Sequence, residues 1–301
     1  MIVSVRTKLK TTIQLPIALI RSTVILMRFK PRFVLGVGGY SSGPVVLMAA
    51  ILNFLRLNRA RIGIIEQNLI PGFTNRVLSW FVHFVFTVFP GTEKYIQGKK
   101  WFRTGNPIRS SMSKMPSSAR NRPFTVFIFG GSQGALGINS LVLSALPHLK
   151  SLSQELKFVH QTGEKDFQRV LEGHQKWGTH ARVEKFVYDM VTAYREASLL
   201  ICRSGSSTLA EIAAIGRASI LIPLPTAADN HQELNAKVFA DAGAALLVSQ
   251  TSASGETLAG LIQNLMQNPE KIEEMETKVR PFYFPNAAKN VVQEFIRAGK
   301  A

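Results

Sequence analysis

A glycine-rich segment stands directly after a long apolar run in the second half of the chain. Residues 130–135 read Gly-Gly-Ser-Gln-Gly-Ala and follow the run Phe124–Phe129. Where a strand enters a helix in this way, glycines allow close approach, and free backbone N–H groups together with the helix dipole favour a bound anion. We therefore predict a diphosphate contact at Gly130, Gly131, Ser132, Gln133 and Gly134. Taken by itself, the loop is equally well explained as a structural turn.

A second polar segment, residues 203–211, reads Arg-Ser-Gly-Ser-Ser-Thr-Leu-Ala-Glu after the run Leu199–Cys202. Two interpretations of Glu211 are open. With Thr208 it matches a capping box, in which the Glu side chain accepts from the cap amide. As a carboxylate beneath a strand end, it can instead accept hydrogen bonds from two ribose hydroxyls. Side-chain chemistry by itself favours the capping interpretation.

A third segment, residues 229–236, places five polar side chains at the start of a helix. Asp229 or Asn230 can be the N-cap, and His231 and Asn235 stand one helical turn apart. Imidazole and amide groups at this position suit sugar hydroxyls. An exposed polar helix start explains the same residues.

In the first half of the chain, the triplet Glu66-Gln67-Asn68 ends an apolar run and can supply polar contacts to an acceptor or a sugar. No DxD-like pair of carboxylates stands at a strand end, so we expect no metal site and no cofactor. Five histidines lie in no ligand-spaced pair, and we expect them to be structural or solvated: His83, His148, His160, His174 and His180.

Apolar runs, each followed by turn residues and a helical stretch, must position these polar segments. The runs cover residues 33–35, 62–65, 124–129, 199–202 and 220–224, and helices are expected over 45–55 and 74–83. Continuous apolar strands that alternate with helices predict parallel sheets covered on both faces, an α/β doubly wound design. Ligands then gather at the carboxyl ends of the strands. Residues 106–123, rich in Pro, Ser, Arg and Met, predict a linker between two α/β domains.

Composition narrows the class of partner. The 301 residues, 46% of them hydrophobic, suffice for two domains with buried cores. Lys and Arg total 36 against 19 Asp and Glu, so the chain is attracted to anionic surfaces or phosphorylated substrates. The charges are dispersed, and no zinc-knuckle spacing or RNP-type motif is present, which argues against nucleic acid. The single cysteine, Cys202, excludes an intrachain disulfide.

The apolar stretch from Leu15 to Leu26 contains Pro16 and Arg21 and is too short to span a membrane. It lacks a clean cleavage site, and we expect it to be mature sequence. We predict that it lies on an anionic membrane surface, unless it is a buried helix of the first domain. The predicted contact comprises Leu15, Ile17, Leu19, Ile20, Ile25 and Leu26, bordered by Arg21, Arg28 and Lys30.

Taken in order, six segments resemble the MurG family, the UDP-N-acetylglucosamine:undecaprenyl-pyrophosphoryl-muramyl-pentapeptide N-acetylglucosaminyltransferases. The segments are residues 36–44, 66–68, 105–109, 130–135, 202–211 and 229–236. The resemblance runs from about residue 31 to about residue 245 and more loosely to the C-terminus. Six motifs in order are more specific than any one of them.

The resemblance implies the GT-B fold, two Rossmann-like doubly wound domains that face a cleft, with the N-terminal one incomplete in this chain. Residues 1–108 would form the acceptor and membrane side, completed by a C-terminal helix within 283–301, and residues 109–282 would bind the donor. The acceptor side would include Gly38, Gly39, Tyr40, Ser41 and Glu66.

By position, the resemblance also assigns roles around the donor, UDP-N-acetylglucosamine. Glu211 would bind the ribose hydroxyls, and Ser132 with neighbouring amides would face the diphosphate. For Glu211 the resemblance therefore favours ribose binding over the capping interpretation, and the side chain can do both. The remaining assignments are Arg203 and Val187 beside the uracil, Asn68, His231 and Gln232 on the sugar, and Arg109 at the cleft.

The implied reaction is an inverting transfer of N-acetylglucosamine to the 4-hydroxyl of a polyprenyl-linked muramyl pentapeptide. Loop amides and a helix dipole, rather than a metal, would stabilise the charge of the departing UDP. The resemblance further implies a peripheral position on the cytoplasmic face of the bacterial cell membrane and partners among cell-wall synthesis proteins.

The chain departs from the family in one respect. Family members open with a glycine loop of the form GGTGGH, whose His is the favoured general base, and no such segment stands in this sequence. We therefore expect an N-terminal sheet without its leading strand and little or no transferase activity from the chain as given. Three other functions stay open: a non-catalytic UDP-sugar-binding module, a GT-B transferase with another glycolipid acceptor, and an anion-binding membrane adaptor.

Overall fold

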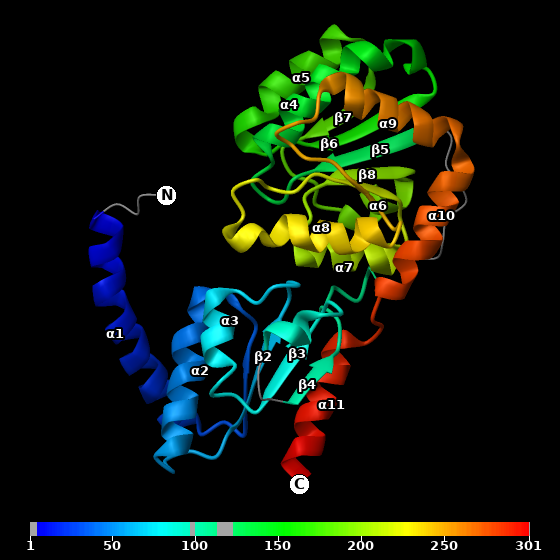
Figure 1. The fold of residues 1–301 in the computed structure, drawn as a ribbon. Helices are drawn as coiled ribbons and strands as arrows, with labels where there is room; N and C mark the ends of the chain where they lie inside the picture. The colour runs from blue at the N-terminus through cyan, green and yellow to red at the C-terminus, as the bar shows by residue number, and fades with distance from the viewer. Residues whose placement is uncertain (1–4, 97–99, 113–122, 301) are drawn as a thin grey trace. The chain divides into compact units, whose positions relative to one another are not determined.

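The computed structural model describes residues 5–96, 100–112 and 123–300, with the backbone alone for residues 5–13, Tyr40 and 298–300. The chain divides into two compact units (Figure 1). Unit 1 holds residues 1–106 and 286–301, and unit 2 holds residues 107–285. Among the described residues, none of the helices combines the length and apolar character that a membrane crossing needs.

Unit 1 contains a sheet of four parallel strands in the order β1-β2-β3-β4. Each described strand therefore lies beside the next one in the sequence. The elements of unit 1 are α1 (Val5–Phe29), β1 (Phe33–Gly36), α2 (Gly39–Phe54), β2 (Arg61–Glu66), α3 (Phe73–Leu78), β3 (Phe84–Thr87), η1 (Thr92–Tyr95), β4 (Lys100–Arg103) and α11 (Ala287–Lys300).

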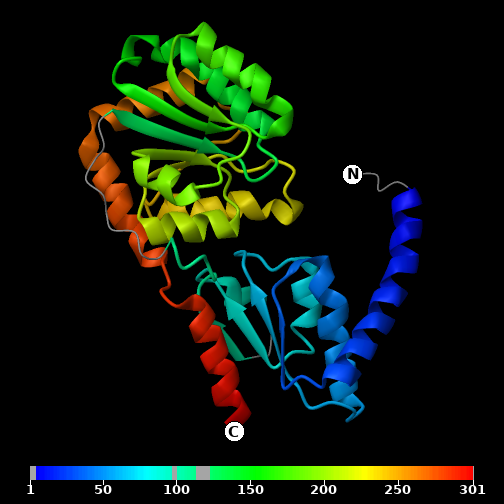
Figure 2. The same cartoon turned by 180° about the vertical axis from the view of Figure 1, so that it is seen from behind.

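Both faces of the unit 1 sheet are covered, and the last helix supplies one of the covers (Figure 2). On one face, Val46 of α2 belongs to a buried cluster with Ile62 and Ile64. On the other face, Phe295 of α11 lies with its ring centre 5.4 Å from that of Phe86. Gly63 is needed here because a Cβ atom at this position would stand 2.8 Å from the Phe295 ring. The C-terminal helix therefore completes the core of unit 1.

The described residues of unit 2 form a sheet of six parallel strands in the order β10-β9-β8-β5-β6-β7. The elements are β5 (Phe124–Phe129), α4 (Leu136–Ala145), η2 (Leu146–Leu152), β6 (Leu156–Gln161), η3 (Glu164–Asp166), α5 (Phe167–Lys176), β7 (His180–Glu184), α6 (Met190–Glu196), β8 (Leu199–Cys202), α7 (Ser206–Ile215), β9 (Ser219–Leu221), η4 (Ala228–Asn230), α8 (His231–Asp241), β10 (Leu246–Leu247), α9 (Gly255–Gln267), α10 (Pro269–Val279) and η5 (Arg280–Phe282). The direction of winding reverses between β5 and β8, and a reversal of this kind is the usual ligand position in such sheets.

The predicted α/β fold with parallel sheets is confirmed, and two helix predictions need correction. The helix expected over residues 74–83 ends at Leu78, because the chain turns there and the Ser79 hydroxyl donates to the Arg76 carbonyl at 2.7 Å. A side chain that binds the preceding turn in this way competes with helical continuation. The helix expected from Val45 begins earlier, at Gly39.

Candidate functional site

The glycine loop of unit 2 leads from β5 into α4. Gly131 and Gly134 have φ angles of 91° and 72°, in the left-handed region that favours glycine. A Cβ atom at Gly134 would stand 1.9 Å from the Thr162 carbonyl oxygen. No side chain caps α4 at its N-cap residue Ala135, so the first-turn N–H groups remain available to an anion.

The loop after β8 begins beside the glycine loop. The strand register pairs Phe129 with Cys202, so both loops start at the same level of the sheet, on the two sides of the winding reversal. Together they line a pocket of about 600 Å³, a size suited to a small ligand. The pocket brings together these predicted site residues: Gly130, Gly131, Gln133, Gly134, Arg203 and Gln232.

Arg203 lines this pocket, and hydrogen bonds hold its side chain in place. Its guanidinium donates to the Ile222 and Pro223 carbonyls at 2.9 and 2.8 Å and to Gln250 Oε1 at 2.6 Å. Burial lowers the pKa of Arg203. Three accepting oxygens therefore hold the planar group in one orientation.

Gln161, at the end of β6, joins two segments of the predicted donor site. Its side-chain nitrogen donates to the Gly131 carbonyl at 2.8 Å, and its oxygen accepts from the Val187 N–H at 2.9 Å. Gln161 is buried, so both bonds lie in a protected environment. The sequence interpretation missed this residue, although a polar side chain at the carboxyl end of a parallel strand could have marked it.

The capping-box interpretation of Glu211 is wrong. Helix α7 begins at Ser206 with Gly205 as its N-cap, so Thr208 lies inside the helix. Glu211 instead accepts a hydrogen bond from the hydroxyl of buried Tyr194 at 2.9 Å. Burial raises the pKa of Glu211, while the Tyr194 hydrogen bond and the charge of Arg109 lower it.

The polar start of α8 is organised by short hydrogen bonds. Asn230 is the N-cap residue, with a left-handed φ of 53°. The Nδ1 atom of His231 lies 2.6 Å from the Ala228 carbonyl oxygen. A carbonyl can only accept, so Nδ1 carries the proton and Nε2 is an acceptor in the neutral ring. Gln232 lines the pocket and accepts from the Leu224 N–H at 3.0 Å. Ser132 is exposed and does not line the pocket.

In unit 1, the loop after β2 is built around the Glu66 carboxylate, which is 2% exposed. Oε1 accepts from the Asn68 N–H at 2.8 Å, and Oε2 accepts from the Asn75 amide at 2.8 Å and the Gly72 N–H at 3.3 Å. Burial raises the pKa of Glu66 and outweighs these hydrogen bonds, which lower it. Glu66 therefore positions the loop, and a direct contact with an acceptor stays a prediction.

Four further predicted residues of unit 1 lie where β1 enters α2: Gly38, Gly39, Tyr40 and Ser41. Gly38 is the N-cap of α2, and Gly38 and Gly39 have φ angles of 87° and 75°. Ser41 is exposed, and the Tyr40 side chain lies outside the described residues. Asn68 also donates its side-chain amide to Glu66 at 3.3 Å.

Three of the histidines serve as structural groups. His83 accepts from the Ile62 N–H at 3.0 Å, and His160 and His174 contact each other at 3.2 Å inside unit 2. Within the parts of the chain that the structure describes, no cluster of three or more His, Cys, Asp or Glu side chains could hold a metal ion. The expected independence from metal stays a prediction.

Comparison with known proteins supports the class that this fold and pocket indicate. The model of the glycosyltransferase family 28 C-terminal domain matches residues 125–293, and that of the N-terminal domain matches residues 3–87. The neisserial UDP-GlcNAc 2-epimerase bound to UDP-GlcNAc shares the fold, with a TM-score of 0.67 at 17% identity over 94% of this chain and 81% of its own. The class is thus a family 28 glycosyltransferase.

Closer relatives carry one name, UDP-N-acetylglucosamine–N-acetylmuramyl-(pentapeptide) pyrophosphoryl-undecaprenol N-acetylglucosamine transferase. The Myxococcus xanthus protein is 43% identical over 94% of this chain and 73% of its own length. An Anaeromyxobacter protein is 42% identical over 92% and 71%. The crystal structure of Acinetobacter baumannii MurG matches with a TM-score of 0.78 and 32% identity, over 95% of this chain and 80% of its own. The chain belongs to the MurG family.

Proposed function

We propose that the chain transfers N-acetylglucosamine from UDP-N-acetylglucosamine to the 4-hydroxyl of a polyprenyl-linked muramyl pentapeptide. The observation that carries this proposal is the identity of 42–43%, over more than nine-tenths of the chain, with transferases of that name. The acceptor oxygen attacks the anomeric carbon, the bond from that carbon to the diphosphate breaks, and UDP leaves with the electron pair. The hydroxyl proton passes to a general base.

The pocket of unit 2 supports a donor that carries a diphosphate. Amides of the glycine loop and the start of α4 hold the diphosphate and stabilise the charge of the leaving UDP. Glu211 binds the ribose hydroxyls with the lone pairs that Tyr194 leaves open, since a carboxylate accepts several hydrogen bonds. Arg203 and Val187 flank the uracil.

The remaining residues act on the sugar. His231 Nε2 accepts from a sugar hydroxyl, because Nδ1 is committed to Ala228. Gln232 and Asn68 add amide contacts to the sugar, and Arg109 supports Glu211 electrostatically. Gly38, Gly39, Tyr40 and Ser41 contribute to the acceptor side.

A two-part assay tests this function. Calorimetry with the full chain should show binding of UDP-N-acetylglucosamine, and release of UDP should depend on the lipid-linked muramyl acceptor. Absence of UDP-sugar binding would reject the proposal. Transfer to a different glycolipid alone would support the second candidate, a transferase with another acceptor.

We further propose that unit 1 contacts the cytoplasmic surface of an anionic membrane through α1. Leu15, Ile17, Ile20 and Ile25 are exposed beside the basic residues Arg21, Arg28 and Lys30. The predicted stripe needs one correction, because Leu26 is 4% exposed and belongs to the core of unit 1. Leu19 is half-buried.

Vesicle sedimentation tests the membrane contact. Replacing Ile17 and Ile20 together by Ser should reduce binding to vesicles that contain anionic lipid, and high salt should weaken binding of the parent, because each basic residue near the surface adds about 1 kcal/mol. Val292→Ser is the matched control, since Val292 on α11 of the same unit is 55% exposed, between Ile17 at 44% and Ile20 at 64%. Equal binding by the double variant and the parent would place the contact elsewhere.

A further inference from the structure

Lys165 lines the pocket of unit 2 together with the glycine loop, yet no predicted role includes it. It lies in η3, the short turn between β6 and α5, and its side chain is exposed. We propose that Lys165 binds the diphosphate of the nucleotide sugar and neutralises the negative charge that grows on UDP as it leaves. This inference rests on the proposed function.

The other charged groups of the pocket are committed to protein partners. Asp166 accepts from the Arg169 guanidinium through both oxygens at 2.7 Å, and this hydrogen bonding holds the pKa of Asp166 below its usual value. The Arg203 guanidinium faces three accepting oxygens of the protein. The partners of Arg203 are neutral oxygens, which fix its guanidinium without cancelling its charge. Among the described residues that line the pocket, Lys165 is the cation whose ammonium group forms no hydrogen bond or ion pair with the protein and can move to a ligand.

The nearest acidic neighbour along the chain does not cancel this charge. Glu164 forms its ion pair with Lys185, at 2.6 Å, rather than with Lys165. Asp166, on the other side, is neutralised by Arg169. Since both adjacent carboxylates have their own cations, the local potential at η3 stays favourable to an anion.

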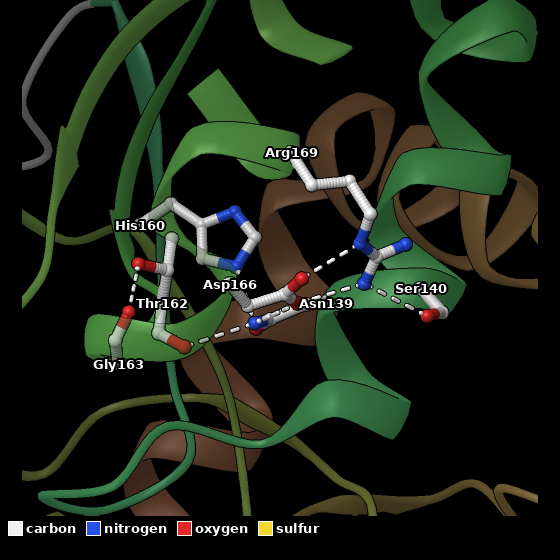
Figure 3. A network of polar contacts seen from close by, with 7 residues as sticks. All are labelled: Asn139, Ser140, His160, Thr162, Gly163, Asp166 and Arg169. Atoms are coloured by element: carbon white, nitrogen blue, oxygen red, sulfur yellow. Dashed lines mark hydrogen bonds and ion pairs between the residues drawn. The ribbon is translucent and has the colours of Figure 1, made fainter. Parts of the chain in front are cut away.

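A buried network fixes the backbone from which Lys165 extends (Figure 3). The Asn139 amide nitrogen donates to the Thr162 carbonyl at 3.0 Å and to Asp166 Oδ2 at 2.7 Å, and the Asn139 oxygen lies 3.1 Å from His160 Nε2. These contacts hold both ends of the turn that carries Lys165.

The same turn packs directly against the glycine loop. Gly163 has a φ of 79°, and a Cβ atom there would stand 2.2 Å from the Gln133 carbonyl oxygen. Lys165 is thus attached two residues from a backbone contact with the predicted diphosphate loop. A lysine chain, which is long and flexible, can reach a phosphate from such a position.

The chemistry explains why a cation helps at this point. The diphosphate of a nucleotide sugar is a diester that gains negative charge when the bond to the sugar breaks. A positive charge that is already in place stabilises this change more than it stabilises the bound substrate, which raises the rate. Lysine serves phosphate groups as a point charge.

Calorimetry on the full chain with UDP and with uridine separates a diphosphate contact from a structural role. Lys165→Met should weaken UDP binding about tenfold, in line with the loss of one charged hydrogen bond at an exposed site, and the difference should shrink at high salt. Uridine, which has no phosphate, should bind the variant as it binds the parent. Lys165→Arg should retain most of the affinity for UDP. Lys150→Met is the matched control, because Lys150 is also exposed but lies in η2, beyond the far end of α4.

Each other outcome has a distinct meaning. Equal UDP affinity in Lys165→Met and the parent would overturn the inference, as would an equal loss for UDP and uridine. In both cases a parent that binds UDP leaves the proposed function intact. A parent that binds neither UDP nor UDP-N-acetylglucosamine would overturn the proposed function and this inference with it.

Discussion

The loop from β5 to α4 in unit 2 and the loop from β2 to α3 in unit 1 both leave backbone N–H groups that need an acceptor. The two loops differ in where that acceptor comes from. Each follows a buried parallel strand and leads to a helix without a side-chain cap. In the loop from β5 to α4, which contains the glycines, no side chain caps the backbone N–H groups. The second folds around its own carboxylate, Glu66, which takes the N–H groups of Asn68 and Gly72. A strand end of this type favours an anion. In unit 1 the chain supplies it as Glu66, and in unit 2 we propose that a ligand supplies it.

Burial shifts the pKa of Glu66 in unit 1 and the pKa values of the buried histidine pair in unit 2 in opposite directions. Burial raises the pKa of Glu66 in unit 1. In unit 2, burial lowers the pKa of His160 to about 3 and of His174 to about 4. The contributions of Glu66 and of the histidine pair to stability should therefore depend on pH in opposite directions.

The largest effect is expected where the chain supplies its own anion. Glu66→Ala leaves the N–H groups of Asn68 and Gly72 and the amide of Asn75 without an acceptor, so the free energy of unfolding should fall by roughly 4 kcal/mol. Glu66→Gln keeps an acceptor oxygen and should lose about half as much. Urea denaturation measures both, and an Ala variant as stable as the parent would deny Glu66 its positioning role.

The glycine loop should respond through ligand binding as well as stability. Gly134→Ala places a Cβ atom against the Thr162 carbonyl at a φ of 72°, so the loop must shift, at a cost of about 3 kcal/mol in unfolding free energy or donor affinity. Gly131→Ala is the control, because its φ of 91° is also strained but no atom lies within 4 Å of the added Cβ. If both variants lost the same unfolding free energy and donor affinity, the contact between Gly134 and the Thr162 carbonyl would not be the cause of the loss.

The histidine pair should make unit 2 sensitive to acid. The pKa values of both histidines are lowered from 6.5, so below pH 6.5 the unfolded chain binds more protons than the folded unit does. The free energy of unfolding is therefore not reduced by this pair above pH 6.5. The free energy of unfolding falls as pH falls toward 4, by roughly 3 kcal/mol for His174 alone. Urea midpoints between pH 7 and pH 4 measure this loss, which should be smaller in His174→Gln.

Glu66 should show the reverse dependence. Its raised pKa favours the folded state at low pH, and this contribution is lost as pH rises from the ordinary value of 4.5 through the folded-state pKa. Replacement by Gln should remove this dependence from the urea midpoints of unit 1. If Glu66→Gln and His174→Gln changed the pH dependence of the urea midpoint in the same direction, the comparison would be contradicted.

The smallest effect concerns the ribose. Glu211→Ala should weaken binding of UDP-N-acetylglucosamine by about 1.5–3 kcal/mol, the scale of hydrogen bonds to a charged group. Tyr194→Phe removes the internal hydrogen bond to Glu211 and leaves the carboxylate, so it should change the affinity less. Equal donor affinity of the Ala variant and the parent, with the fold intact, would exclude the ribose role.

Several features were determined by the sequence alone. The runs 124–129 and 199–202 mark β5 and β8 at their observed bounds, because strands buried on both faces read as continuous apolar segments. The glycines of the loop after β5 were equally visible, since a left-handed φ is a local requirement. Together these features located the strand ends that line the pocket.

Other features were decided only by tertiary structure. Strand β7 lies at the sheet edge and is half-exposed, so its polar residues gave no apolar run. Thr208 and Glu211 have the spacing of a capping box, but the helix begins at Ser206, and Glu211 accepts from the hydroxyl of Tyr194, 17 residues away. Gln161 likewise depends on partners 30 and 26 residues distant. Burial and hydrogen-bond partners of this kind arise when separate strands are brought side by side, and no local pattern records them.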